Sequence, residues 1–302
     1  MRVGVHRWIT EPPPPQPSPQ GGGGSDPRDK DRMLDDIAFW VSYLTNGKHL
    51  TWYASFQFTI FAALMGGALA VVFGLTGATL KNSRFLPFRL IGSFYSAIVR
   101  GVPDVLFFLF FPLAFEQAVE WFVATQVCTV ESIAAQSAPW PPCREANWFL
   151  GTFEYLMLAS VSLGLVYGAF ATNVIHGAMR SVPHGQLEAA RAYGMSASQV
   201  LWRVHIRQMW VYALPGLSNV WMLIIKATSL LSLLQIADIV LWADRLGAPN
   251  YLPTVGLVHD DWRWRYYLVL FVFYILVTWL SERAFEAIMR RAGRGILSEA
   301  NG

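Results

Sequence analysis

The sequence predicts an all-α integral membrane protein with five transmembrane helices. The 302-residue chain is 54% hydrophobic and only 14% charged, whereas about a quarter of the residues in soluble domains are charged. Long uncharged runs recur along the chain, and the charged residues gather between them. The runs are long enough for helices that cross a hydrocarbon core of about 30 Å.

The N-terminal region differs in composition from the rest. Residues 1–32 contain the stretch EPPPPQPSPQGGGG, which cannot build a core and predicts a disordered tail rich in proline and glycine. The alternative that residues 1–32 are a mis-called start before Met33 stays open. We expect residues 33–50 to form an outer segment, residues 51–295 the transmembrane domain and residues 296–302 a C-terminal tail.

Four of the five spans follow directly from the apolar runs. Residues 50–80 carry no charge and predict a first helix at about 52–78. Residues 155–175 predict the third span, and residues 208–237, with Lys226 as their single charge, predict the fourth. Residues 266–280 are short for a span, but Trp262 and Trp264 extend this run as aromatic belt residues and predict the fifth.

The second apolar region is interrupted by the stretch RGVPD at residues 100–104. Neither half is long enough to cross a membrane alone. We therefore expect an interfacial helix over about residues 86–99. Pro103 would then open a spanning helix that ends near residue 122.

The distribution of Lys and Arg predicts which side of the membrane each loop occupies, because cytoplasmic loops are enriched in these residues. The larger set lies on one side of the predicted spans: Lys81, Arg84, Arg89, Arg180, Arg191, Arg203, Arg207, Arg283, Arg290, Arg291 and Arg294. The smaller set lies on the other: Arg144, Arg245, Arg263 and Arg265. We therefore expect an outer N-terminus, a cytoplasmic C-terminus and a cytoplasmic loop at residues 181–207.

This loop predicts two short helices. Pro183 suits a first helical position and Gly194 a left-handed C-terminal stop, and SASQ at residues 196–199 is a capping box that starts a second helix. Four apolar residues of that helix fall on one face at helical spacing: Ala197, Val200, Leu201 and Val204.

The stretch EAARAYG at residues 188–194 combines an ionic side chain with small ones. Ala189 and Ala190 would let a partner approach the backbone closely, and Glu188 offers an ionic contact. The residues alone leave a second interpretation open, in which the loop is an ordinary amphipathic segment on the lipid surface.

Four stretches in order carry a family resemblance. The stretch VPHGQLEAARAYGMSASQVLWRVHI resembles the EAA loop of ABC-importer permease subunits. RGVPDVL at 100–106, LGLVYGAFATNVIHGAMRSVP at 163–183 and YALPGLSNVWMLIIKATSLLSLL at 212–234 agree with it. Together they are similar to the polar amino-acid permeases, most closely to the histidine/lysine/arginine/ornithine and opine permease subunits.

The resemblance implies an ABC type I importer permease fold in a bacterial inner membrane. It implies that Glu188, Ala189, Ala190 and Gly194 belong to a coupling helix that docks on a cytoplasmic ATPase subunit, which binds the ATP. A second permease subunit, the same or a related chain, and an extracytoplasmic solute-binding protein are further implied partners. The implied substrate is a polar amino acid, with basic amino acids or opines first and glutamine or another polar solute as the alternative.

The chain departs from the family pattern in two places. The loop usually ends in a proline where this chain has Arg207, which leaves the geometry of the loop exit open. In the third span, Asn173 replaces a carboxylate and His176 replaces an arginine. A salt bridge has then become a neutral pair, or a site for a cationic substrate has changed; both alternatives stay open.

The candidate substrate pathway consists of Asn173 in the third span and of Lys226, Thr228 and Ser229 in the fourth. A charge inside a span usually faces a cavity or a partner, and the resemblance also places a lysine and a threonine on the pathway here. The alternative for Lys226 is a snorkelling or structurally paired side chain.

Several other functions lack the residues that they need. The sequence has no phosphate-binding GxxxxGK[ST] motif, so we expect no ATPase site in this chain. We also expect no enzymatic activity, cofactor or metal. The arginines follow the membrane topology and do not indicate a nucleic-acid-binding surface. Cys128 and Cys143 both fall in the long outer loop, where an oxidising compartment would allow a disulfide; two unpaired thiols are the alternative.

Overall fold

The computed structural model describes residues 27–135, 140–148, 150–253 and 257–293. Across these residues the regular structure is helical, apart from one isolated β-bridge between Asn250 and His259. Five helical segments are long and apolar enough to cross a membrane, which confirms the predicted class and number of spans. The spans are α2 (Gly47–Lys81), α4 (Asp104–Val127), α6 (Thr152–Ser181), the continuous segment Ala197–Leu234, and α11 (Arg263–Gly293).

The chain divides into two compact units, Met1–Asn46 and Gly47–Gly302. In the first unit the structure describes helix α1 (Pro27–Leu44). The expected boundary at residue 32 falls inside this helix, and the expected boundary at residue 50 falls in the first turn of α2. Residues 1–26 of the tail expected at 1–32, and the whole C-terminal tail expected at 296–302, lie outside the described residues.

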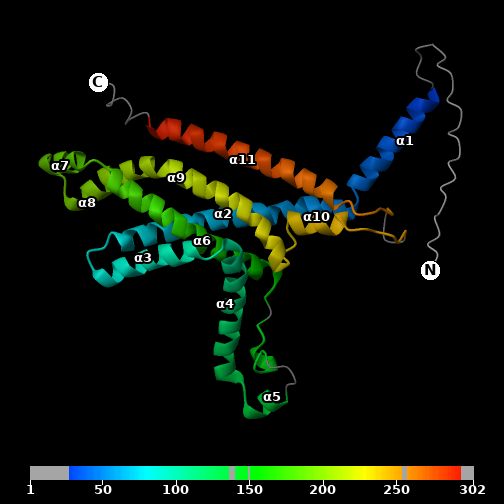
Figure 1. The fold of residues 1–302 in the computed structure, drawn as a ribbon, viewed down its shortest axis with the longest axis horizontal. Coiled ribbons are helices and arrows are strands. Elements are labelled where there is room, and N and C mark those ends of the chain that lie inside the picture. The colour runs from blue at the N-terminus through cyan, green and yellow to red at the C-terminus, as the bar shows by residue number, and fades with distance from the viewer. Residues whose placement is uncertain (1–26, 136–139, 149, 254–256, 294–302) are drawn as a thin grey trace, which may run out of the picture. The chain divides into compact units, whose positions relative to one another are not determined.

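Helix α6 is the centre of the second unit and packs along α2 (Figure 1). Small residues allow the close approach: a Cβ atom on Gly164 would lie 2.5 Å from the Cβ of Leu69, and one on Gly77 would lie 2.2 Å from Oγ1 of Thr172. Close packing at glycines is the usual means by which membrane helices associate, because lipid supplies no hydrophobic drive for their contact. Gly168, one turn further along α6, makes a similar approach, since a Cβ there would lie 2.6 Å from the Cβ of Phe73.

Helix α3 (Leu86–Gly101) is not the interfacial helix expected at 86–99. It runs beside α2 and α6 instead of across their ends (Figure 1). Its buried face consists of Gly92, Ser96 and Val99, and a Cβ on Gly92 would lie 2.9 Å from the Gly77 carbonyl oxygen. The sequence predicts an amphipathic helix. The small residues of α3 and α2, such as Gly92 and Gly77, explain why the more polar face of α3 packs against α2 and α6.

The RGVPD stretch breaks the helix where it was expected to. Val102 and Pro103 are extended, α3 ends at Gly101 and α4 begins at Asp104. Two contacts hold this break against α6: Tyr167 donates a 3.0 Å hydrogen bond to Asp104, and the Arg100 guanidinium lies 5.3 Å from the centre of the Phe170 ring.

Short elements complete the second unit. Helices α5 (Val130–Ala134) and η1 (Arg144–Ala146) follow α4, and α10 (Ile239–Gly247) joins the fourth span to α11. The segments α7 (His184–Ala192), α8 (Ala197–Gln199) and the π-helix η2 (Val200–His205) precede α9 (Ile206–Ala227), which continues as the 3₁₀ helix η3 (Thr228–Leu234).

Near the start of α11, α10 packs against α2 and α11. His49 and Tyr266 share a 2.9 Å hydrogen bond, and the indole of Trp52 donates to the Ile239 carbonyl at 3.0 Å. These contacts fix the ends of α2 and α11 to the same short helix.

Candidate coupling loop and transport pathway

Local signals build the loop that joins the third and fourth spans. Pro183 was predicted as the first helical residue, but it is the N-cap of α7, and the helix begins one position later at His184. Gly194 has φ +79°, which confirms the predicted left-handed stop. The backbone N–H of Met195 then donates to the Ala190 carbonyl at 3.2 Å and so closes the end of α7. The short helix therefore has defined limits at both ends.

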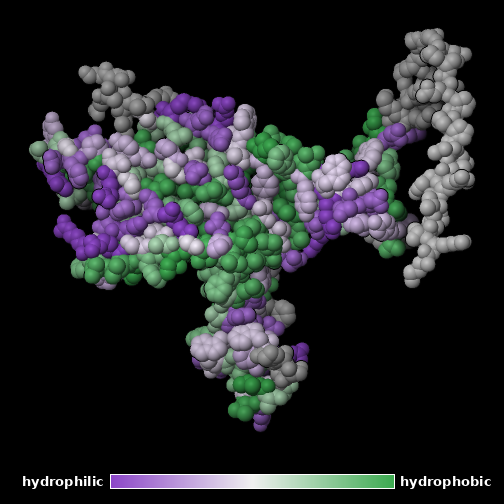
Figure 2. Space-filling model, viewed as in Figure 1, coloured by the Kyte–Doolittle hydropathy of each residue, from purple (hydrophilic) through white to green (hydrophobic). Residues whose placement is uncertain are grey.

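The four predicted coupling residues do not all face outward. Glu188, Ala189 and Gly194 are exposed, but Ala190 is buried at 7% exposure in a helix that packs against η2. The sequence analysis missed Tyr193, whose side chain is 89% exposed at the end of α7. A large aromatic side chain this exposed beside exposed small residues is the type of surface that partners use. Figure 2 shows hydrophilic side chains gathered at the end of the molecule that carries α7 and α8.

The second half of the loop is a continuous helix with one irregular turn. Ser196 and Gln199 form the predicted capping box, in which the Ser196 N–H donates to Oε1 of Gln199 at 2.9 Å. The predicted apolar face is only partly formed, because Val200 is buried whereas Leu201 is 45% exposed. The π-helical turn of η2 explains this difference, since its wider spacing rotates the residues that follow.

The missing proline at the loop exit has a structural consequence. With Arg207 at that position the backbone N–H is retained, and the helix runs on from η2 into α9 without a break. The His205 ring donates a 3.0 Å hydrogen bond to the Met179 carbonyl near the end of α6. The loop exit is thus tied to the span that leads into the loop.

Asn173 belongs to a polar contact among three helices. Its Oδ1 accepts a 2.7 Å hydrogen bond from the Lys81 ammonium at the end of α2, and the same ammonium donates to Oγ of Ser96 on α3 at 3.2 Å. The proposed neutral pair between Asn173 and His176 is not what the structure shows. Lys81 was missed, because nothing in the sequence connects it with a residue 92 positions away.

The other three candidate pathway residues lie where α9 becomes η3. Thr228 is fully buried, and its hydroxyl donates to the Ile225 carbonyl at 2.7 Å. The Ser229 hydroxyl is half-buried and donates to the Lys226 carbonyl at 2.8 Å. The Lys226 side chain is exposed and lines a groove between α9 and α11. Asn173 and Lys226 therefore have different neighbours, and the predicted pathway residues do not form one cluster.

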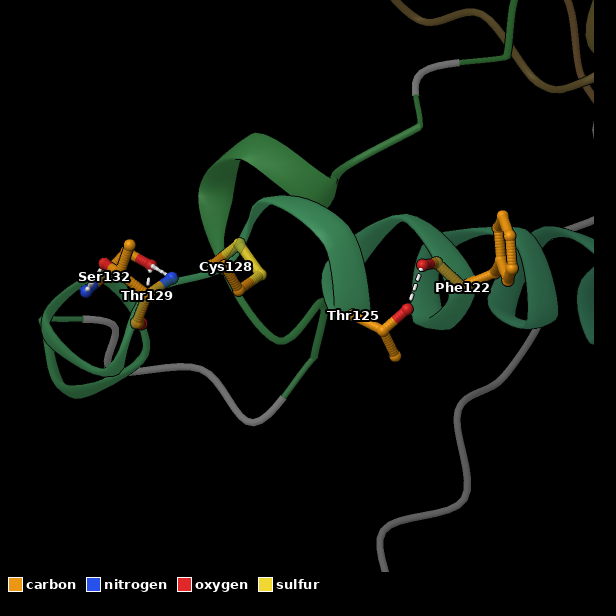
Figure 3. Close-up of a disulfide and its surroundings, with 6 residues drawn as sticks. Phe122, Thr125, Cys128, Thr129 and Ser132 are labelled. Carbon is orange, nitrogen blue, oxygen red and sulfur yellow. Dashed lines mark hydrogen bonds between the residues drawn. A yellow bond between two sulfur atoms is a disulfide. The ribbon is translucent and has the colours of Figure 1, made fainter.

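The outer loop is closed by a disulfide between Cys128 and Cys143 (Figure 3). This settles the alternative that the sequence left open. Beside it, Glu120 is 4% exposed and accepts hydrogen bonds from the Trp140 indole at 2.6 Å and the Trp148 backbone N–H at 3.1 Å. The disulfide and this carboxylate hold the described part of the loop against the end of α4.

A five-span helical bundle, with a polar helical loop inserted between its third and fourth spans, is the architecture of a membrane permease. The chain belongs to the family of binding-protein-dependent transport system inner membrane components, whose model matches residues 70–294.

Individual relatives agree with this family. The chain is 31% identical over 248 residues to the nopaline transport system permease protein of Agrobacterium fabrum, covering 80% of this chain and 90% of the relative. It is 30% identical over 238 residues to the histidine/lysine/arginine/ornithine transport system permease protein of Salmonella typhimurium, covering 79% and 91%. It is 29% identical over 239 residues to the octopine transport system permease protein of Rhizobium radiobacter, covering 79% and 88%.

Solved structures have the same fold. A crystal structure of an amino acid ABC transporter with histidines superposes with a TM-score of 0.58 at 19% identity, covering 85% of this chain and 97% of that one. An inward-facing structure of the MetNI methionine ABC transporter superposes with a TM-score of 0.50 at 14% identity, covering 80% and 94%. The predicted importer permease fold is confirmed.

Proposed function

We propose that this chain is the permease subunit of an ATP-driven importer for polar amino acids, with basic amino acids or opines as its substrates. The named substrates of the relatives support this class. Import of glutamine or another polar solute is the alternative. Substrate would cross by alternating access, in which a ligand that binds two states with different affinities shifts the equilibrium between them.

The single observation that carries the proposal is the geometry of α7. It is a short helix with defined ends, exposed Glu188 and Ala189, and a left-handed glycine that turns the chain back toward the bundle. We propose that a separate ATPase subunit grips this surface and supplies the ATP hydrolysis, while this chain has no ATPase site of its own. Motion of α7 would pass to α6 through Val182, which is buried at 3% exposure between them.

The assembly that we propose contains two permease subunits, identical or related, two ATPases and an extracytoplasmic solute-binding protein. The N-terminus would lie outside, and the C-terminus and the α7 loop inside the cell, as the Lys and Arg distribution supports. In this arrangement the disulfide-closed loop after α4 faces the oxidising side.

The pathway residues divide into two groups under this proposal. Lys226 and Ser229 keep their place on the pathway, because neither is fully buried and Lys226 lines a groove. Asn173 holds α6 to α2 and α3 through Lys81, and Thr228 packs inside the bundle. The half-buried Asn173, whose Oδ1 is already bonded to Lys81, and the buried Thr228 position the spans instead of touching substrate.

Co-purification with the ATPase tests the proposal. Glu188→Lys and Gly194→Asp should abolish ATP-dependent uptake and weaken ATPase retention, because the first reverses a charge at the docking surface and the second disturbs the end of α7. Glu131→Lys makes the same charge change on the exposed α5 and should leave ATPase retention unchanged. Normal uptake and retention in both α7 variants would contradict the coupling assignment.

A further inference from the structure

The turn between α2 and α3 carries positive charge without a local counter-charge. Arg84 lies in the turn and Arg89 lies near the start of α3, and both side chains are exposed. Across the residues that the structure describes, neither guanidinium makes a hydrogen bond, an ion pair or a cation–π contact. The sequence has no Asp or Glu between Asp36 and Asp104. The turn therefore keeps two positive charges that no described side chain neutralises.

The neighbouring end of α6 supplies no acid either. The Lys81 ammonium reaches Asn173 of α6 at 2.7 Å, so the turn lies at the end of the bundle from which α6 leads into α7 (Figure 1). Helix α6 has no Asp or Glu after Glu154, and Arg180 near its end is exposed. Because the Lys81 ammonium is already engaged inside the bundle, Arg84 provides the nearest uncommitted donors on the turn, together with the arginine at the start of α3.

An apolar row on α3 begins beside these arginines. Leu86, Leu90 and Phe94 lie four residues apart on one face of the helix, and all three are exposed. The opposite face packs on the bundle through Gly92 and Ser96. The row covers eight residues, which is about 12 Å along the helix. Figure 2 shows hydrophobic side chains along α3, next to hydrophilic ones at the same end of the molecule.

The arginines lie at the boundary of the apolar region and not inside it. The apolar run of α2 ends at Leu80, and both arginines follow within nine residues. The rings of Phe85 and Phe88 lie beside them, exposed, with their centres 6.3 Å apart. Arginine next to exposed phenylalanine is typical of segments at the boundary between hydrocarbon and headgroups. The charges are therefore placed at headgroup level, and the apolar row leads from them toward the hydrocarbon.

A ligand that fits the whole surface carries an anion and a hydrocarbon chain in one molecule. A guanidinium matches the oxygen atoms of a phosphate and can bind them through two parallel hydrogen bonds. A soluble anion would use the arginines and leave the apolar row uncovered. A cytoplasmic protein would reach Arg84 but not Phe94, which lies further along a helix that packs beside two membrane spans.

We propose that the α2–α3 turn and the outer face of α3 bind an anionic phospholipid. The lipid phosphate would lie between Arg84 and Arg89, with an acyl chain along Leu86, Leu90 and Phe94. A lipid with a net negative charge is favoured over a zwitterionic one, because the latter brings a cation of its own to a surface that already holds two. This site is independent of the proposed import function.

Lipid binding to the purified full-length chain in detergent tests the inference. Native mass spectrometry resolves the complex with one bound lipid, and the probes are phosphatidylglycerol, which is anionic, and phosphatidylcholine, which has no net charge. Two arginines should make phosphatidylglycerol bind about 30-fold more tightly than phosphatidylcholine. Arg84→Gln and Arg89→Gln should each weaken phosphatidylglycerol about fivefold, the effect of one basic side chain near the surface, and leave phosphatidylcholine unchanged.

Arg290→Gln is the matched control. Arg290 lies near the end of α11 and pairs with Glu286 at 3.3 Å, so its charge already has a counter-charge, and the variant should bind phosphatidylglycerol as the wild type does. Phe94→Ser tests the apolar row and should weaken both lipids by the same factor, because it removes a contact with the chain and not with the headgroup. The arginine and phenylalanine variants should melt at the wild-type temperature, since these side chains are exposed.

Several results would overturn the assignment. Equal affinity of the wild type for the two lipids would do so, as would unchanged phosphatidylglycerol binding in Arg84→Gln and Arg89→Gln, or an equal loss in Arg290→Gln. Displacement of phosphatidylglycerol by glycerol phosphate would identify a soluble phosphate as the ligand. Loss of bound phosphatidylglycerol on addition of an ATPase subunit would identify the turn as a contact with that protein.

Discussion

The α7–α8 loop and the polar contacts inside the bundle are built in opposite ways. In the loop, hydrogen bonds join close neighbours, as between Ser196 and Gln199 or between Met195 and Ala190. In the bundle, Lys81 bonds to Asn173 across 92 positions. Short sequence motifs therefore determine the geometry of the loop, whereas the polar contacts in the bundle depend on how whole helices pack. A substitution in the loop should disturb one turn, and a substitution in the bundle should disturb several helices.

Asp238 makes a local hydrogen bond, as residues of the loop do, but its side chain is buried, as in the bundle. Its titration should give the largest effect on the free energy of unfolding. Its carboxylate caps α10 by accepting from the Leu241 N–H at 2.9 Å, yet it is fully buried, outside the five spans. Burial raises its pKa from 3.8 to about 6, against the opposing hydrogen bonds from the Leu241 and Val240 backbone. The folded state thus holds a proton that the unfolded state releases, and stability should fall as pH rises from about 4 to about 6 and then level off.

The size of this change is about 3 kcal/mol, from a pKa shift of about two units. Thermal unfolding of the purified protein across this pH range measures it, and Asp238→Asn should lose that part of the slope. A variant with the same pH profile as the wild type would show that Asp238 does not carry the effect.

Gly77→Ala tests packing within the bundle. The new Cβ would lie 2.2 Å from Oγ1 and 3.1 Å from Cβ of Thr172, so rotation of the threonine side chain does not relieve the overlap. We expect a loss of about 1–3 kcal/mol in unfolding free energy. Gly177→Ala on α6 is the control, since its Cβ would meet nothing within 4 Å; it should stabilise the helix by about 0.5–1 kcal/mol. Equal effects of the two variants would remove packing as the cause.

Lys81→Met tests the three-helix contact. It leaves Oδ1 of Asn173 and Oγ of Ser96 without their shared donor, which should cost about 1–3 kcal/mol. A double-mutant cycle with Asn173→Leu should give a coupling energy of about 0.5–3 kcal/mol. Additive losses in the unfolding measurement would mean that the two side chains act independently.

Gly194→Ala should have the smallest effect on stability, because the strain is confined to one residue. A Cβ there meets nothing within 4 Å, so the substitution isolates the cost of φ +79°, about 1–2 kcal/mol for a residue with a side chain. ATPase retention should nevertheless fall more than the melting temperature does, since the end of α7 is displaced. Retention equal to that of the wild type would show that the loop tolerates another ending.

The sequence predicted the fold well where apolar length decides it, and less well where packing does. All five spans were predicted from predominantly apolar runs. Helices α2 and α11 extend beyond their predicted limits, because backbone hydrogen bonding continues past the apolar window. The placement of α3 was wrong because its small buried residues, such as Gly92, have meaning only beside a partner. In the candidate sites, the roles of Gly194 and of the Ser196 capping box could be predicted from local sequence. The groove lined by Lys226 and Glu282 could not, because it forms only when α9 and α11 pack side by side.

The sidedness of α7 tests the central claim most directly. The two cysteines of the chain are joined in a disulfide, so Ala189→Cys supplies a single free thiol on an exposed position. A membrane-impermeant maleimide should label it in inside-out vesicles stripped of ATPase, fail to label it in right-side-out vesicles, and lose access when the ATPase is added back. Labelling in right-side-out vesicles, or labelling that added ATPase leaves unchanged, would contradict the assignment of α7 as the contact with the ATPase.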